Sequence, residues 1–296
     1  MRMLLTGKNG QVGFELQRAL APLGEVHAVD STDCDLSHTD ALRAMIRRVQ
    51  PHIIINPAAY TAVDKAEDEA ERAMAVNAVA PGVMGEEAAR LGASVIHYST
   101  DYVFDGAKGA PYLEADQPAP ISTYGHSKRA GEAALQGATA QHLILRTSWV
   151  VGAHGNNFAR TMLRLAAERD SLKVVNDQHG APTSAALLAD LTAHLVRQLQ
   201  QTGPEKFPFG LYHLTASGET TWYEYARFVL ACAEQHGHLG LRVKAHQVCP
   251  IDSSSYATQA KRPLNSRLDT HLFQQTFGLR LPHWQDGLRH ILDQIL

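Results

Sequence analysis

Cysteine is scarce in this sequence, and its three copies are not placed to build a framework. Cys34, Cys232 and Cys249 are an odd number with wide spacing in a chain of 296 residues. This pattern suits neither a disulfide scaffold nor a zinc site, so we expect reduced thiols and a cytoplasmic location. The 16 histidines are scattered without His-x-x-x-His pairs, and we predict no metal ligands.

Long apolar runs and an excess of basic charge are also missing. No apolar segment approaches the ~20 residues that cross a bilayer, and the N-terminal residues read directly as a strand without room for a signal peptide. With 27 basic and 30 acidic residues, the formal net charge is −3, which provides no basic field for a nucleic-acid backbone. We therefore expect neither a membrane nor a nucleic-acid partner. A hydrophobic content of 45% indicates a globular protein with a substantial core.

The sequence does contain a regular alternation of short aliphatic runs and longer amphipathic stretches. The predicted strands are residues 3–6, 26–30, 53–56, 95–99, 143–146 and 172–175, with a further short strand at 212–214. The predicted helices are residues 11–21, 39–49, 67–91 with a break near Pro81, 127–135, 157–168, 184–201, 222–234, 267–277 and 283–295. Strands that are apolar on both faces and alternate with helices predict an α/β fold with a Rossmann-type, doubly wound parallel sheet.

The pattern loosens after about residue 150. Prolines at positions 182, 250 and 263 mark loops that fit a smaller C-terminal lobe folded against the sheet. We therefore predict a nucleotide-binding domain over residues 1–150, with a sheet completed by 151–176 and 184–201. Residues 151–296 would mainly form a substrate-binding lobe, with a soft boundary between the two parts.

A glycine-rich loop follows the first predicted strand. Gly7, Gly10 and Gly13 have the Gly-x-x-Gly-x-x-Gly spacing that permits a tight turn, a close approach to a pyrophosphate, and packing of the next helix on the strand. The helix N-terminus then offers free N–H groups to the phosphates. The loop predicts a dinucleotide site, although a plain glycine turn has the same residues.

The second predicted strand ends at Asp30. A carboxylate at this place accepts hydrogen bonds from the adenosine ribose, and the acidic turn that follows favours NAD over NADP. Asp30 could instead simply end a strand in a turn.

Tyr124 and Lys128 are four residues apart in a predicted helix and so share one face. At ~4 Å and an effective dielectric of ~20, an ammonium stabilises a phenolate by about 4 kcal/mol, which equals roughly three pKa units. Lys128 could therefore bring the phenol of Tyr124 into the range for general acid catalysis, although the spacing also occurs by chance.

Hydroxyl and carboxylate groups follow the fourth predicted strand, at the edge where doubly wound sheets bind ligands. Thr100 could hydrogen-bond a substrate carbonyl and the Tyr124 phenol, and Asp101 could hold a sugar hydroxyl. Capping of a short helix is the alternative role for both residues.

These features together resemble the extended short-chain dehydrogenase/reductase family and, within it, the dTDP-4-dehydrorhamnose reductases. The matching motifs span nearly the whole chain and are residues 7–13, 56–61, 62–67, 99–104, 124–128, 146–150, 155–158, 177–183 and 262–267. The later motifs are the more specific, because they separate these reductases from epimerases and dehydratases that share the fold.

The resemblance implies roles by position in this sequence. The catalytic residues would be Tyr124, Lys128 and Thr100. The cofactor would lie along Gly7, Gly10, Gln11, Val12, Gly13, Asp30, Asp35, Leu36, Ala59, Tyr60, Thr61, Tyr98, Tyr124 and Lys128. The sugar nucleotide would meet Thr100, Asp101, Tyr124, Trp149, Arg262 and Asn265, although Trp149 could equally be a core or rim aromatic.

The implied reaction is reduction of the 4-keto group of dTDP-4-dehydro-L-rhamnose to dTDP-L-rhamnose, with NADPH or NADH as cofactor. The implied partners are a dTDP-sugar and a second copy of the chain in a homodimer. Some relatives hold magnesium at their dimer interface through acidic residues. Glu15 fits that pattern, but Ala186 stands where an acid is expected, and we assign no magnesium ligand.

Two other functions are compatible with the same residues. A sugar-nucleotide epimerase or dehydratase would hold NAD tightly without consuming it. A non-catalytic regulatory subunit would bind cofactor on the same fold, but would not need Thr100, Tyr124 and Lys128.

Overall fold

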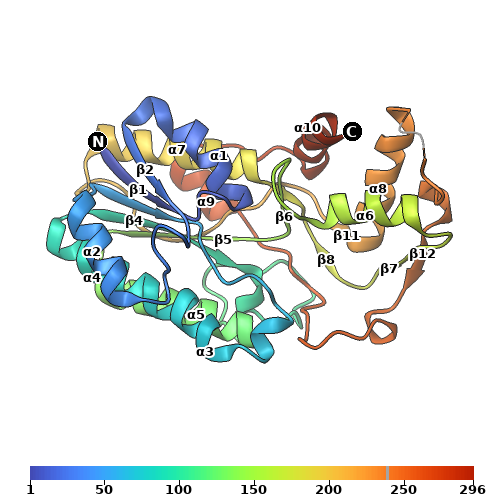
Figure 1. Cartoon of the computed structure of the whole chain (residues 1–296), viewed down its shortest axis with the longest axis horizontal. Coiled ribbons are helices and arrows are strands. Elements are labelled where there is room, and N and C mark those ends of the chain that lie inside the picture. Colours follow the sequence, from blue (N-terminus) through green and yellow to red (C-terminus); the bar gives the residue numbers. More distant parts are fainter. Residues whose placement is uncertain (238–239) are drawn as a thin grey trace.

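The computed structural model describes residues 1–237 and 240–296 and is built around a six-stranded parallel sheet (Figure 1). The strands lie in the order β10-β5-β4-β3-β1-β2. Their bounds are β1 Arg2–Thr6, β2 Glu25–Val29, β3 Ile53–Asn56, β4 Ser94–Thr100, β5 His142–Thr147 and β10 Gly210–His213. The order reverses at β1, and the crevice beside β1 and β3 is where a doubly wound sheet accepts a ligand.

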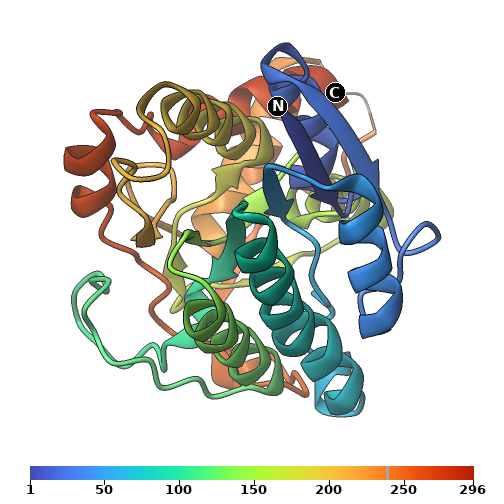
Figure 2. The same cartoon turned by 90° about the vertical axis from the view of Figure 1, so that its left-hand side faces the viewer.

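Helices cover both faces of this sheet (Figures 1 and 2). One layer holds α1 Gln11–Leu20, α7 Ala185–Thr202 and α9 His271–Phe277. The opposite layer holds α2 Thr39–Val49, α4 Ala80–Leu91 and α5 Thr123–Ala138. Successive side chains of each strand enter opposite clusters, since Met3 and Leu5 face the first layer while Leu4 faces the second. The predicted α/β doubly wound fold is confirmed.

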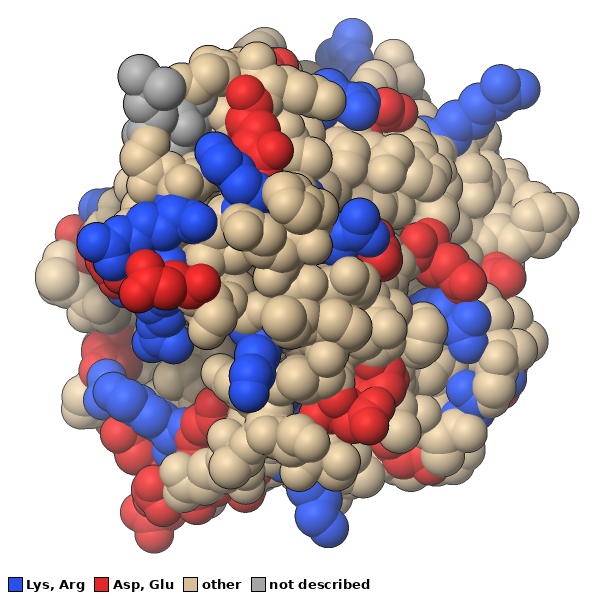
Figure 3. Space-filling view, turned by 90° about the vertical axis from the view of Figure 1, so that its right-hand side faces the viewer, with Lys and Arg blue, Asp and Glu red and all other residues tan. Residues whose placement is uncertain are grey.

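A smaller lobe extends beyond the carboxyl ends of these strands (Figure 1). Its elements are β6 Val150–Val151, α6 Phe158–Glu168, β7 Lys173–Val175, β8 His179–Gly180, β9 Thr183–Ser184, β11 Thr220–Thr221, α8 Trp222–Gln235, β12 Cys249–Ile251 and α10 Trp284–Ile295. These helices enclose a core of their own around Tyr225, Trp284 and Leu288. The charged side chains on the lobe face of Figure 3 are mixed in sign.

The prediction that residues 172–175 complete the main sheet is wrong. Among the described residues, β7 pairs with β12 in a separate two-stranded sheet, and β10 supplies the sixth strand of the main sheet by pairing with β5. The chain therefore enters the lobe after β5, returns to the sheet with α7 and β10, and enters the lobe again. Apolar character identified β7 as a strand, but a run of three or four residues carries no information about its partner.

The expected helix break at Pro81 is also absent. The chain is helical from α3, Ala70–Met74, through a π-helical segment at Ala75–Val79 into α4. Pro81 lies in the first turn of α4, where a missing N–H costs little. Asn77 in the π-helical segment is buried, and its side chain bonds both backbone groups of Tyr60, in the loop after β3, and the hydroxyl of Ser127 on α5.

Side-chain caps define where several helices begin. Ser122, Asn157, Ser184 and Thr221 each accept a hydrogen bond from a backbone N–H of the first turn, as preferred N-cap residues do. Across residues 1–237 and 240–296, every helix is too short or too polar to span a bilayer.

Candidate active site

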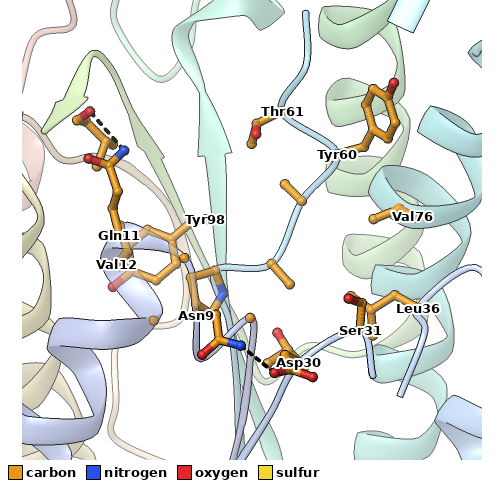
Figure 4. Close-up of a pocket in the computed structure, with 18 of the residues that line it drawn as sticks. Asn9, Gln11, Val12, Asp30, Ser31, Leu36, Tyr60, Thr61, Val76 and Tyr98 are labelled. Atoms are coloured by element: carbon orange, nitrogen blue, oxygen red, sulfur yellow. Dashed lines mark hydrogen bonds between the residues drawn. The ribbon is translucent and has the colours of Figure 1, made fainter. Parts of the chain in front are cut away.

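A cleft of about 580 Å³ opens along the carboxyl ends of β1 to β5. All the residues predicted to contact the cofactor line it, from Gly7 in the glycine loop to Lys128 on α5. Sequence reasoning missed several lining residues: Asn9, Ser31, Cys34, Arg72, Val76, Ser99, Thr147, Val150, Gly155 and Asn156. The volume falls in the range usual for ligand sites. In Figure 4, Gln11 lies on one side of the cleft and Leu36 and Val76 lie on the other.

The glycine loop has the backbone geometry that a pyrophosphate site requires. Gly7 has a φ of 63°, which favours glycine, and the N–H of Gly10 donates to its carbonyl at 2.9 Å. A Cβ atom on Gly13 would lie 2.0 Å from the Gly7 carbonyl oxygen. Helix α1 therefore packs closely on the loop and directs the free N–H groups of its first turn into the cleft.

We expect Gly13→Ala to abolish cofactor binding, because the added methyl group forces the loop and α1 apart. Titration of NADPH fluorescence with purified variant checks this. The matched control is Gly137→Ala on α5, where a Cβ meets nothing within 4 Å. That variant should bind cofactor normally and be as stable as the parent or more so, since alanine is the better helix former. Normal binding by Gly13→Ala would contradict the assigned role of the loop.

Asp30 is held in place by its own turn. Its carboxylate accepts hydrogen bonds from the Thr32 N–H at 2.8 Å, the Thr32 hydroxyl at 2.6 Å and the Asn9 side chain (Figure 4). The two bonds from Thr32, with Lys8 nearby, lower the pKa of Asp30 to about 2. The carboxylate is thus charged and fixed at the end of β2, inside the cleft. Asp30 thus shapes the turn and also lines the cleft, and its contact with a ribose stays a prediction.

Tyr124 lies in the first turn of α5 at the inner end of the cleft. Ser122 caps this helix by accepting from the Gly125 N–H at 3.2 Å. A Cβ on Gly125 would lie 2.2 Å from the Tyr102 carbonyl oxygen, so only glycine allows this close packing of α5. Burial raises the pKa of Tyr124 to about 12, and the neighbouring Thr100 hydroxyl opposes this shift.

Lys128 lies one turn further along α5 and is bonded to β4. Its Nζ atom donates to the Tyr98 carbonyl at 2.7 Å and lies 3.3 Å from Nε2 of His97. Burial lowers the pKa of Lys128 to about 8. The expectation that Lys128 lowers the pKa of Tyr124 is wrong for this structure, because desolvation of the phenol dominates and the ammonium is directed to β4.

Thr100 and Asp101 stand at the end of β4, close to Tyr124. The Thr100 Oγ1 atom accepts from the Tyr102 N–H at 3.2 Å and lies 3.1 Å from Oδ1 of Asp101. Thr100 thus caps the short helix Asp101–Val103, as the alternative interpretation expected. The Oδ2 atom of Asp101 is buried without a hydrogen-bond partner among the described residues. Burial raises the pKa of Asp101 to about 6. An unpartnered oxygen beside the predicted catalytic group is well suited to a ligand hydroxyl.

The remaining predicted substrate residues lie in the lobe and in the segment that closes it. Trp149 has a φ of 46° and stacks on Trp222 with ring centroids 3.7 Å apart. Arg262 forms an ion pair with Asp64 at 2.7 Å, and its Nη1 atom is buried without a partner among the described residues. Asn265 donates to the Lys108 and Ala110 carbonyls and accepts from Arg267, so its side chain is engaged in holding a loop.

Acidic residues do not gather into a metal site in the part of the chain that the structure describes. Glu15 pairs with Arg18, which also pairs with Asp190 at 3.0 Å. A basic side chain thus lies between the two carboxylates on this face.

The residues present fit a bound dinucleotide. The glycine loop and α1 offer N–H groups at one part of the cleft, and Asp30 offers a ribose acceptor at another. Thr147, at the end of β5, lines the cleft with a buried hydroxyl that lacks a partner among the described residues. Gln11 joins this cleft to the lobe, because its Oε1 atom accepts from the Gly152 N–H at 2.8 Å.

Comparison with known proteins agrees with this geometry. A family model described as the RmlD substrate binding domain matches residues 1–296. A dTDP-4-dehydrorhamnose reductase of Escherichia coli (strain K12) is 52% identical over 299 residues, covering 100% of this chain and 98% of the relative.

Two solved structures are also similar. A dTDP-4-dehydrorhamnose reductase of Clostridium acetobutylicum has a TM-score of 0.90 and 34% identity, covering 99% of each chain. A dTDP-4-dehydrorhamnose reductase of Bacillus anthracis, solved in complex with NADP, has a TM-score of 0.89 and 33% identity, again over 99% of each chain. The resemblance predicted from the motifs is confirmed, and the chain belongs to the RmlD substrate binding domain family.

Proposed function

We propose that this protein uses NADPH or NADH to reduce the 4-keto group of dTDP-4-dehydro-L-rhamnose to dTDP-L-rhamnose, the last step of dTDP-rhamnose biosynthesis. The observation that carries this proposal is the position of Tyr124 and Lys128 on one face of α5 at the inner end of the dinucleotide cleft. The full-length similarity to dTDP-4-dehydrorhamnose reductases supports the choice of substrate.

A reduced nicotinamide held in this cleft would supply a hydride to C4 of the sugar. Tyr124 would donate its phenolic proton to the oxygen at C4. The raised pKa of Tyr124 keeps its proton in place across the physiological range, so the acid is loaded before the reaction begins. Thr100, next to it, would turn its hydroxyl from Asp101 to the same oxygen and would stabilise charge that develops there.

Lys128 and Asp101 would orient the two reactants. The Lys128 ammonium is anchored to β4 by the Tyr98 carbonyl and has N–H capacity left for the nicotinamide ribose. Asp101, with its free Oδ2 atom, would accept from a sugar hydroxyl. Trp149 and Arg262 would border the rest of the sugar nucleotide, and the order imposed on both reactants would supply much of the rate acceleration.

The test is to mix the purified protein with dTDP-4-dehydro-L-rhamnose and, separately, NADPH or NADH, and to follow the absorbance of the reduced cofactor. Stoichiometric oxidation with formation of dTDP-L-rhamnose is the expected result. An epimerase or dehydratase would convert the sugar without net oxidation. A regulatory subunit would bind cofactor without turnover, and either outcome would overturn the proposal.

Asp30 gives a prediction about the choice of cofactor. Its charged carboxylate accepts from a ribose hydroxyl but repels the extra phosphate of NADPH. We expect Asp30→Asn to raise the ratio of kcat/KM for NADPH over NADH by roughly tenfold, which corresponds to about 1.4 kcal/mol. Steady-state kinetics with both cofactors check this. Asp40→Asn, which removes an exposed carboxylate in the first turn of α2 outside the cleft, is the control and should leave the ratio unchanged.

The organisation of the molecule is part of the same proposal. Residues 1–150 would bind the cofactor and residues 151–296 would mainly hold the sugar nucleotide. We also propose a homodimer in the cytoplasm, where reduced nicotinamide and sugar nucleotides are available to it. The described cysteines form no disulfide, which supports a reducing compartment. Light scattering on protein that elutes from a size-exclusion column tests the homodimer. The mass of a monomer would contradict that part of the proposal.

A further inference from the structure

A row of buried polar side chains runs across three neighbouring strands and ends at Lys128. Thr6 at the end of β1 lies 2.6 Å from Asn56 at the end of β3, measured from Oγ1 to Oδ1. The Asn56 Nδ2 atom lies 3.0 Å from Nδ1 of His97 on β4, and Nε2 of His97 lies 3.3 Å from Nζ of Lys128. All four side chains are at most 2% exposed. Each polar atom that is buried in a core needs a hydrogen-bond partner, so the members of this row depend on one another.

We propose that His97, supported by Asn56 and Thr6, is a positioning residue that holds the Lys128 ammonium for the reaction. This inference rests on the proposed reductase function. An ammonium group has three N–H donors. The Tyr98 carbonyl takes one at 2.7 Å. When its ring proton lies on Nδ1, His97 takes the second at Nε2, which leaves the third for a ligand in the cleft. Without His97, one N–H of a buried ammonium would have no acceptor.

The imidazole of His97 can serve either charge state of Lys128. Burial keeps the pKa of His97 well below its ordinary value, so the ring is neutral and carries one N–H. With Nδ2 of Asn56 facing Nδ1, the ring proton lies on Nε2 and donates to an unprotonated amine. With the Asn56 amide turned by 180°, the ring proton lies on Nδ1, and Nε2 accepts from the ammonium. In the second arrangement Asn56 donates to Thr6 Oγ1.

The other charged groups around Lys128 leave His97 as its closest side-chain partner. Glu132 on α5 accepts two hydrogen bonds from Arg146 on β5, both at 2.7 Å, and one from Ser99 on β4 at 2.6 Å. Glu132 from α5, itself paired with Arg146 on β5, is the charged group that acts on the ammonium, and His97 and Tyr98 contact it from β4. Burial lowers the pKa of Lys128 to about 8, and Glu132 opposes this only in part.

The test compares two amide variants of His97. In His97→Gln, the side-chain amide reaches the position of Nε2 and can still accept a hydrogen bond from Lys128. In His97→Asn, the shorter side chain places its amide at the position of Nδ1, where it contacts only Asn56. Loss of an acceptor disfavours the charged form, so the pKa of Lys128 falls further in His97→Asn. The alkaline limb of the profile of kcat against pH, which reports loss of the Lys128 proton, should then move down by about one pH unit, with a loss of roughly fivefold in kcat at pH 8. His97→Gln should keep the limb within a few tenths of the parent.

NADPH affinity against pH gives a second readout that needs no sugar turnover. It should show the same downward shift for His97→Asn, so the inference stays testable even if the reductase function fails. His213→Gln removes another buried histidine, on β10, and serves as the control. It should lower the melting temperature without moving either profile.

Two outcomes would overturn the inference. One is an unshifted alkaline limb in His97→Asn. The other is an equal loss in both His97 variants that follows their melting temperatures, because this is what a merely structural role predicts. If His97→Asn does not fold, Thr6→Val replaces it, since it removes the end of the row at constant shape. If the alkaline limb of the kcat profile of Thr6→Val lies several tenths of a pH unit below that of the parent, the proposal is supported. An unshifted limb would reject it.

Discussion

Tyr124→Phe lowers kcat by roughly 10²–10⁴-fold, the usual contribution of a positioned general acid. The phenol is the group at the inner end of the cleft that carries a transferable proton next to Thr100. The change removes one oxygen and leaves the ring that packs edge-on against Tyr102 with centroids 5.6 Å apart. NADPH affinity should therefore stay within about threefold of the parent, because the effect lies in the chemical step. Steady-state turnover and fluorescence titration of NADPH separate the two quantities.

Tyr212→Phe is the matched control for this experiment. It removes a hydroxyl on β10 that donates to the Pro208 carbonyl outside the cleft, and should retain most of kcat. Near-normal turnover in Tyr124→Phe with an unchanged melting temperature would remove the proton-donor role from this residue. It would direct attention to Thr100 or to a bound water as the acid.

Glu132→Ala should destabilise the fold by about 3–5 kcal/mol, because it leaves a buried charge without its partner. Glu132 and Arg146 are among the most buried charged residues described, with side chains 0% and 2% exposed. Arg146 lies on β5, in the sheet between the two helical layers. Its Nε and Nη2 atoms both donate to the Glu132 carboxylate at 2.7 Å. Denaturant unfolding, followed by circular dichroism at two wavelengths, measures the loss.

A surface ion pair provides the contrast. Glu86 pairs with Arg43 at 2.6 Å but is about half exposed, so Glu86→Ala should cost at most about 1 kcal/mol. Similar losses in the two variants would contradict the special role of the buried pair. Replacing Glu132 and Arg146 together with apolar residues should recover much of the stability that the single change removes.

The buried pair also has a consequence for the site. Glu132 belongs to α5, the helix that carries Tyr124 and Lys128, and its carboxylate accepts from Ser99 on β4. Strand β4 in turn carries His97, Tyr98 and Thr100. One carboxylate therefore fixes the register between the helix and the strand that supply the predicted catalytic groups. Variants of Glu132 should therefore lose some activity even in molecules that remain folded, because this register is then less well fixed.

Local sequence alone was sufficient for the fold class and for the position of the dinucleotide cleft. Aliphatic runs at β1, β3 and β4 are apolar on both faces, and this pattern distinguishes a covered parallel sheet from other arrangements. The glycine spacing and the four-residue spacing of Tyr124 and Lys128 are also local properties. Each depends on neighbours within one turn or one loop, so tertiary packing did not need to be known.

The partners of the short strands and the charge states in the site were decided by the tertiary structure. β7 and β10 are similar short runs, yet only β10 lies beside β5, since pairing is a contact between distant segments. The pKa of Tyr124 is raised and not lowered, because its burial depends on distant segments such as β4 and the turn after it, which the Tyr124–Lys128 spacing does not reveal. The roles of His97 and Arg146 were missed for the same reason. A polar residue inside an apolar strand indicates that a buried partner exists. Only the fold shows that the partner of His97 is Lys128 and that the partner of Arg146 is Glu132.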